Sequence, residues 1–194
     1  MIALCGVGIA LMFVVTAFIQ FPMPIAGGGY VHLGDAVLFV ISAIFGPIVG
    51  TVVGGAGGFF ADLYLGYPMY MGFTLVIKAV QGLVVGVMFK RLRQNIFGYI
   101  GAMLFAGLWM IAAYFLVDNI LFNIEVALSA SLGNLFQIIA GVVFAIIAYP
   151  TVARMRLADA MEEYNEAILS GEYDVEKEDN KSDVDADKHE TVIK

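Results

Sequence analysis

Two charged residues, Asp62 and Lys78, interrupt long apolar segments of the chain. Lys78 lies about eight residues into the apolar run Tyr70–Phe89, roughly 12 Å along a helix. A charge at mid-membrane costs about 2.5–3.5 kcal/mol, so such residues usually face the protein interior and are paired. We therefore expect Lys78 and a carboxylate to frame a polar ligand site. The alternatives are a purely structural ion pair or a lysine that extends to the membrane surface.

The string His32-Leu33-Gly34-Asp35 opens an apolar segment and is a second candidate site. Histidine and aspartate both bind metals, but no third ligand is near in the sequence, so we expect no metal. Two interpretations remain: a ligand contact through His32 and Asp35, or a helix N-cap formed by Asp35.

More polar residues follow later in the chain. We expect a loop before the last apolar helix to hold Asp118, Asn119, Asn123 and Glu125. Asn134 and Gln137 come soon after, within that helix. With the polar residues above, they predict a pocket at one face of the molecule.

The patterns of several catalytic sites are absent from the sequence. It contains no GxxxxGK[ST], HExxH or GxSxG string. The two histidines, His32 and His189, are far apart in the sequence, and no serine is an evident partner of either in a catalytic Ser–His pair. The single cysteine, Cys5, excludes a disulfide framework and a cysteine-based zinc site. We expect no enzyme and no cofactor, and the basic clusters are too small for nucleic-acid binding.

The elements that position these residues belong to a membrane protein. Hydrophobic residues make up 61% of the 194 residues and charged residues 14%, with a mean hydropathy of +0.89. Soluble domains are about 45–50% apolar and about 25% charged. Residues 1–153 carry four acids and four bases, so the net charge of −7 belongs to residues 154–194.

Proline and glycine clusters divide the apolar region into six segments of roughly membrane-spanning character. The expected helices are Met1–Phe21, Asp35–Phe45, Ile48–Leu65, Tyr70–Phe89, Ile96–Val117 and Leu128–Tyr149. The lysines and arginines follow the fourth and sixth segments, which places both termini in the cytoplasm by the positive-inside rule. The predicted fold class is an all-α integral membrane protein with six transmembrane helices.

Small residues recur at four-residue spacing, which lets helices approach closely in lipid. Gly50, Gly54 and Gly58 do so in the third segment, where we expect internal packing. In the first segment, Ala3, Gly6 and Ala10 form a small-residue stripe, for which internal packing and a partner subunit are equally open interpretations.

Residues Gly27–Phe89 resemble the substrate-binding S component of energy-coupling factor (ECF) vitamin transporters. The matching features are the HLGD string, a Gly-Pro turn, a glycine-rich helix ending in Ala-Asp, a Gly-Tyr-Pro loop and a helix with a central lysine. The stretch GNLFQIIAGVVFAIIAYP is similar to the family's sixth helix, with its Asn and Gln three residues apart. The resemblance covers most of residues 1–155 and favours the hydroxymethylpyrimidine or pyridoxine branch over riboflavin.

The resemblance implies a non-catalytic subunit in a bacterial cytoplasmic membrane that binds one vitamin near the outer face and topples to deliver it inward. It also implies partners, a transmembrane T component and two cytoplasmic ATPases. The implied substrate-binding residues are His32, Asp35, Lys78, Asn119, Asn134 and Gln137. The implied T-component contact is Ala3, Gly6 and Ala10. Five aromatic residues are available to line the pocket: Tyr30, Tyr67, Tyr70, Trp109 and Tyr114.

A different class of function stays open, a stand-alone secondary transporter that uses Asp62, Lys78 and Asp35 as a proton relay. Uptake driven by a proton gradient, in vesicles that contain this chain alone, would identify it. For domain organisation, we expect a membrane domain over residues 1–157 and an acidic cytoplasmic tail over residues 158–194. Residues 154–168 can extend the sixth helix, and the segment beyond Ser170 is predicted to be disordered.

Overall fold

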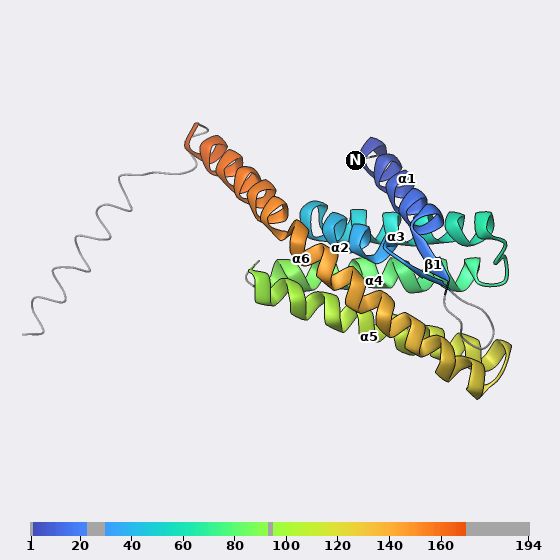
Figure 1. The fold of residues 1–194 in the computed structure, drawn as a ribbon. Coiled ribbons are helices and arrows are strands. Elements are labelled where there is room, and N and C mark those ends of the chain that lie inside the picture. The colour runs from blue at the N-terminus through green and yellow to red at the C-terminus, as the bar shows by residue number, and fades with distance from the viewer. Residues whose placement is uncertain (1, 23–29, 93–94, 170–194) are drawn as a thin grey trace, which may run out of the picture. The chain divides into compact units, whose positions relative to one another are not determined.

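The computed structural model describes residues 2–22, 30–92 and 95–169. In this part of the chain, six helices and one short hairpin follow each other (Figure 1). The elements are α1 (Ile2–Phe18), β1 (Gln20–Pro22), β2 (Tyr30–His32), α2 (Gly34–Phe45), α3 (Pro47–Leu65), α4 (Met71–Arg91), α5 (Ile96–Leu121) and α6 (Ile124–Leu169). The predicted all-helical class and the six helical segments are confirmed, apart from the hairpin.

The chain divides into two units, residues 1–153 and 154–194, which we describe separately. The first contains the hairpin and the helices up to the middle of α6. Of the second, the structure describes residues 154–169, which are helical. The predicted extension of the last helix is therefore confirmed. The predicted disorder beyond Ser170 falls outside the described residues.

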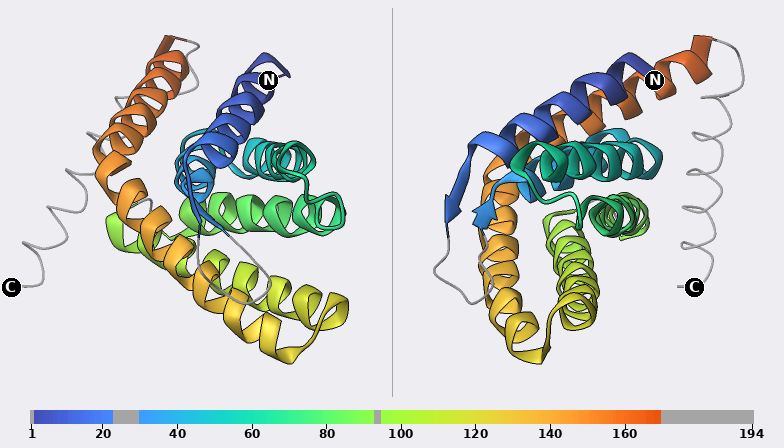
Figure 2. Two further views of the ribbon diagram at one scale, coloured as in Figure 1. Left: turned by 45° about the vertical axis from the view of Figure 1, so that its right-hand side comes forward. Right: turned by 90° about the vertical axis from the view of Figure 1, so that its right-hand side faces the viewer.

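The antiparallel hairpin β1–β2 was not predicted from the sequence. It pairs Gln20 with His32, Phe21 with Val31 and Pro22 with Tyr30. Figure 2 shows the hairpin directly after α1 and directly before α2. Its register places His32 two residues before the first residue of α2, so the hairpin positions one of the predicted site residues.

Two glycines with positive φ set the turns around α3. Gly46 has φ 85° and separates α2 from α3, which begins with Pro47 at a position where its missing N–H costs nothing. Gly66 has φ 84° and ends α3 in the left-handed conformation that glycine adopts most readily. These turns confirm the predicted split of the second apolar block at Gly46-Pro47.

Glycines also bring α3 against α4, as the four-residue spacing predicts. A Cβ on Gly54 would collide with the backbone carbonyl of Lys78, and one on Gly82 with the carbonyl of Gly50. Gly58 lies against Thr74, where a Cβ would come 2.8 Å from the Thr74 Cγ2 atom. The close contact holds the backbone of α4 around Lys78 in a fixed place beside α3.

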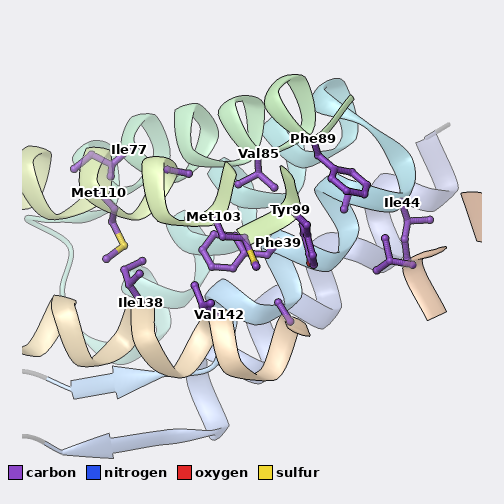
Figure 3. Close-up of a cluster of buried hydrophobic side chains, with 14 of the residues drawn as sticks. Phe39, Ile44, Ile77, Val85, Phe89, Tyr99, Met103, Met110, Ile138 and Val142 are labelled. Atoms are coloured by element: carbon purple, nitrogen blue, oxygen red, sulfur yellow. The ribbon is translucent and has the colours of Figure 1, made fainter. Parts of the chain in front are cut away.

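Two apolar clusters form the interior of the first unit. The larger joins α2, α4, α5 and α6, and Figure 3 shows its side chains meeting between these helices. The smaller joins α1, α2 and α3 around Met12, Leu38 and Val53. α2 therefore contributes to both clusters, whereas α3 reaches the other helices through its direct contact with α4.

Four helices in the described part of the chain are long and apolar enough to cross a membrane: α3, α4, α5 and the Ile124–Met155 part of α6. α1 has 17 residues and α2 has 12, whereas a full span needs about 20. A multi-span membrane protein is thus supported. Spanning by α1 and α2, and hence the count of six spans, stays a prediction.

Several predicted helix ends differ in the structure. α1 ends at Phe18 rather than Phe21, and α6 begins at Ile124 rather than Leu128, so Glu125 lies in the helix and not in a loop. α5 continues to Leu121, so Asp118 and Asn119 lie in its last turn, and only Phe122 and Asn123 link α5 to α6. Asn123 Oδ1 accepts a hydrogen bond of 2.9 Å from the Val126 amide, which satisfies a free N–H at the start of α6. α6 continues through Pro150. A proline inside a helix removes one backbone hydrogen bond, and the loss of this bond does not end the helix here.

Candidate functional site

His32 forms the junction between the hairpin and α2. Its Nδ1 accepts a hydrogen bond of 3.1 Å from the Gly34 amide, one of the free N–H groups at the helix start. Burial, partly offset by nearby Asp35, lowers the pKa of His32 from 6.5 to about 4. The imidazole is therefore neutral at physiological pH, as an accepting Nδ1 requires.

Asp35 lies in the first turn of α2, but its side chain does not cap the helix. Both carboxylate oxygens point into the core: Oδ1 accepts from the Lys78 ammonium, and Oδ2 accepts from Gln137 Nε2 at 2.7 Å. The N-cap interpretation of Asp35 is therefore wrong, and it is His32 that satisfies a backbone amide of this turn.

Asp35, Lys78 and Gln137 come from α2, α4 and α6 and meet in one buried cluster. Lys78 is 2% exposed and Asp35 is fully buried. Met110 from α5 completes the cluster, since its sulfur accepts from Lys78 Nζ at 2.9 Å and lies 3.7 Å from Gln137 Nε2. Four helices thus each contribute one side chain, and three of the predicted site residues are brought together.

The opposite charges of Asp35 and Lys78 make this cluster tolerable in an apolar interior. Two isolated buried charges would each cost several kcal/mol, and a pair offsets this only with additional hydrogen bonds. Gln137 and Met110 supply such contacts. The cluster can therefore offer a carboxylate, an ammonium and a carboxamide to a polar ligand at one point of the core.

A line of polar contacts joins α4 to α5 on one side of this cluster. The Tyr70 hydroxyl donates to Asp118 Oδ1 at 2.6 Å, and the Thr74 and Tyr114 hydroxyls lie 2.9 Å apart. In the first of these pairs Tyr70 is the donor and the Asp118 carboxylate is the acceptor.

The other predicted site residues lie apart from the cluster contacts. Asn134 is half-buried, one turn before Gln137 on α6, and Asn119 is exposed in the last turn of α5. Asp62 is buried on α3, whereas the carboxylate paired with Lys78 is Asp35. The ion pair that the sequence left open is therefore assigned to Asp35.

Three of the five predicted aromatic candidates border α4. Besides Tyr70 and Tyr114, Trp109 donates from Nε1 to the Ile77 carbonyl at 3.2 Å. The rings of Tyr67 and Tyr70 meet edge to face with centroids 6.5 Å apart. The side chain of Tyr30 falls outside the described residues.

The stripe Ala3, Gly6 and Ala10 lies on the exposed side of α1. In the part of the chain that the structure covers, no atom of another element approaches within 4 Å of a Cβ built on Gly6. Gly8, by contrast, packs against Val53 of α3. Among the described residues, the stripe is therefore left exposed and Gly6 meets no other element.

Sequence reasoning missed Met110, Thr74 and Gln81, all close to the cluster in sequence or space. Thr74 and Gln81 are buried on α4 with Lys78 between them. The spacing of Tyr70, Thr74, Lys78 and Gln81, at four, four and three residues, is that of one helix face. This signal was present in the sequence, whereas the contact of Met110 with Lys78 depends on how α5 packs.

Comparison with known families gives a match over the whole of the first unit. Residues 1–156 match the family model described as "ECF-type riboflavin transporter, S component". The sequence is 32% identical over 130 residues to a Pyrococcus woesei protein described as "uncharacterized protein in gap 3'region", covering 67% of this chain and 86% of that one.

A second relative carries a functional name. The "thiamine precursor transporter HmpT" of Lactococcus lactis is 29% identical over 153 residues, covering 79% of this chain and 87% of that protein. Among solved structures, the S component for biotin from an ECF-type ABC transporter superposes with a TM-score of 0.60 at 19% identity, over 80% of this chain and 89% of that chain. The structural likeness is one of fold.

Proposed function

The chain belongs to the family of ECF-type riboflavin transporter S components, and on this premise we propose that it captures a small aromatic water-soluble vitamin or vitamin precursor with high affinity. As a member of this family it is a non-catalytic subunit of a membrane transporter. The observation that carries the proposal is the convergence of Asp35, Lys78 and Gln137 from three helices.

This cluster suits a small polar heterocycle. The ammonium of Lys78 and the amide N–H of Gln137 donate, and the carboxylate of Asp35 and the Gln137 carbonyl accept. A pyrimidine or pyridine carries ring nitrogens and a hydroxymethyl group that use both kinds of partner. His32, from the hairpin, and Asn134, one turn from Gln137, lie next to these residues along the chain and are proposed as further contacts.

Hydroxymethylpyrimidine is the substrate we favour, ahead of pyridoxine and riboflavin. The similarity to a protein named as a thiamine precursor transporter supports this choice, because hydroxymethylpyrimidine is the pyrimidine half of thiamine. The family name points to riboflavin, so riboflavin stays among the compounds to be tested.

The proposed assembly and topology follow from the family. The chain would cross a bacterial cytoplasmic membrane six times with both termini inside. It would bind a transmembrane T component and two cytoplasmic ATPases, and topple to release the vitamin inward. The exposed stripe Ala3, Gly6 and Ala10 supports a T-component contact at α1, since small residues let a partner helix approach closely.

Binding by the purified full chain in mild detergent tests the proposal. Calorimetric titration with hydroxymethylpyrimidine, pyridoxine, riboflavin, thiamine and biotin should give tight binding of one one-ring compound. Gln137→Leu should weaken that binding at least tenfold, because it removes a donor and an acceptor from the cluster. Ser131→Ala is the matched control on α6, since Ser131 bonds only locally to the Ala127 carbonyl at 2.8 Å.

Failure of every compound to bind a folded preparation would contradict the proposal. Uptake of a vitamin by vesicles that contain this chain alone, driven by a proton gradient, would support the secondary transporter with Asp62, Lys78 and Asp35 instead. Dependence of uptake on added T component and ATPases would support the assembly proposed above.

A further inference from the structure

One face of α4 carries a continuous row of polar side chains, which we call the α4 polar row: Tyr70, Thr74, Lys78 and Gln81. Their spacing of four, four and three residues keeps them on one side of the helix. Thr74, Lys78 and Gln81 are each at most 4% exposed. The row therefore runs along the interior from Tyr70, the residue just before α4, to the middle of the helix.

The first three members of the row have partners on other helices. Tyr70 bonds to Asp118, Thr74 to Tyr114, and Lys78 to both Asp35 and Met110. Gln81 differs from them. Among the described residues, neither its Oε1 nor its Nε2 has a hydrogen-bond partner, although the side chain is fully buried.

The surroundings of Gln81 make this exceptional. Ile77 and Val85 lie one turn before and one turn after it on α4, and both belong to the larger apolar cluster. Figure 3 shows Ile77 and Val85 facing side chains of that cluster, with Met103 of α5 below Val85. A buried polar group without a partner destabilises the fold, because it has lost its hydrogen bonds to water and gained none in return. A water molecule would need two to four polar partners to occupy such a place.

A carboxamide presents one donor and one acceptor side by side. Its natural complement is a ring edge with an adjacent acceptor and donor, such as the ring nitrogen and amino group of an aminopyrimidine. Gln81 is three residues from Lys78, about 4.5 Å along the helix axis. One planar ring can therefore reach Gln81 with one edge and the Asp35–Lys78–Gln137 cluster with a polar substituent on another.

We propose that Gln81 is the deep end of the ligand site and reads the aminopyrimidine edge of the substrate through paired hydrogen bonds. This inference rests on the proposed function and narrows its substrate class. Pyridoxine has no adjacent amino group and ring nitrogen, so the unpartnered amide of Gln81 would discriminate against it. A site built to bond a polar group rejects analogues that lack it.

The test is calorimetric titration of the full chain with two probes. These are 4-amino-5-hydroxymethyl-2-methylpyrimidine and the same compound without its amino group. The variants are Gln81→Met, with Gln81→Leu as a second apolar replacement if the first does not fold. Ser42→Ala is the matched control, because Ser42 Oγ is also buried without a partner in the described structure but lies on α2 against Gly50.

We expect Gln81→Met to bind the amino compound roughly ten- to a hundredfold more weakly than wild type. Its affinity for the compound without the amino group should change little, so that the two losses are not additive. Without ligand, the variant should be as thermally stable as wild type or more stable, because the substitution removes an unpaired amide from an apolar core. Ser42→Ala should bind both probes like wild type.

Equal affinity of wild type and Gln81→Met for the amino compound would overturn the inference, as would equal losses for both probes. If wild type binds pyridoxine or riboflavin but not the aminopyrimidine, the proposed vitamin binding is supported. The proposed recognition of an aminopyrimidine by Gln81 is then wrong. If wild type binds no vitamin at all, both fail together.

Discussion

Asp35 and Lys78 stabilise each other in an interior where either charge alone would be strongly unfavourable. Removal of one partner of a buried pair costs about 3–5 kcal/mol, whereas replacement of both by apolar residues is often neutral. Single and double substitutions of the pair can therefore distinguish a role of these two side chains in stability from a role in ligand binding.

We predict that Asp35→Leu and Lys78→Met each destabilise the ligand-free chain by about 3 kcal/mol. The double variant should recover most of this loss, because it leaves no unpaired charge. Vitamin binding should be lost in all three. Thermal unfolding in detergent and calorimetric titration measure the two effects, and additive destabilisation in the double variant would contradict the prediction.

His32 gives the junction between the hairpin and α2 a defined pH dependence. Its pKa is about 4 in the folded chain against 6.5 for an unperturbed histidine. Between these values the unfolded chain binds the proton first, so stability falls as the pH falls from 6.5 to 4. The full contribution is about 3 kcal/mol, at 1.36 kcal/mol per pKa unit.

The His32→Asn variant isolates this contribution. The asparagine oxygen can accept from the Gly34 amide but does not titrate. We expect wild type to lose stability relative to the variant as the pH is lowered from 7 to 4, by unfolding curves recorded at each pH. Parallel curves for the two proteins would show that His32 does not take up a proton on unfolding.

At the scale of the elements, the close contact between α3 and α4 depends on glycines, which have no side chain to hold the two backbones apart. We predict that Gly82→Ala is strongly destabilising, since its Cβ would meet the Gly50 carbonyl, a backbone atom that cannot move aside. Gly72→Ala is the control on the same helix, because open space surrounds Gly72 within the described structure. Gly72→Ala should be neutral or stabilising by up to about 1 kcal/mol.

Thermal unfolding of both variants in the same detergent separates these effects. A Gly82→Ala chain as stable as wild type would mean that α3 and α4 are further apart than the structure places them. The Gly82→Ala variant should also bind the vitamin more weakly, because Lys78 lies one turn from Gly82 on α4.

The helices were predictable because their ends carry strong local signals. Gly46-Pro47 and Gly66 set the turns around α3 through backbone conformation alone. The hairpin was missed since its strands have three residues each, too few for a periodic pattern. The continuation of α6 past Pro150 was also expected, since residues 154–168 were predicted to extend the sixth helix.

The members of the site were predictable in part, but their pairing was not. Asp35, Lys78 and Gln137 are conspicuous as polar residues in apolar segments. Whether Asp35 or Asp62 pairs with Lys78 depends on how α2 and α3 are rotated about their axes relative to α4. That rotation cannot be predicted from a sequence pattern. Gln81 could have been found from the spacing of the α4 polar row, but its lack of a partner is visible only in the packed structure.

At the scale of the whole molecule, the proposed contact with the T component lies on α1. We predict that Gly6→Leu leaves folding and vitamin binding unchanged, because open space surrounds Gly6 in the described part of the chain. Vitamin uptake in cells that also produce the T component and ATPases should drop strongly, since the new side chain separates the two surfaces.

Gly101→Leu provides the control for this experiment. Gly101 lies on α5, also with no atom of another element within 4 Å of a built Cβ, among the residues described. Uptake by this variant should match wild type. Normal uptake by Gly6→Leu would place the T-component contact elsewhere on the molecule.

The mutual cancellation of the Asp35 and Lys78 charges has an electrical consequence. A unit charge carried across a membrane gains or loses about 2.3 kcal/mol per 100 mV of membrane potential. A site that moves through the bilayer with one carboxylate, one ammonium and an uncharged vitamin transfers no net charge. The membrane potential then leaves the ratio of its inward to outward positions unchanged, so in the assembly proposed above the voltage would not drive transport.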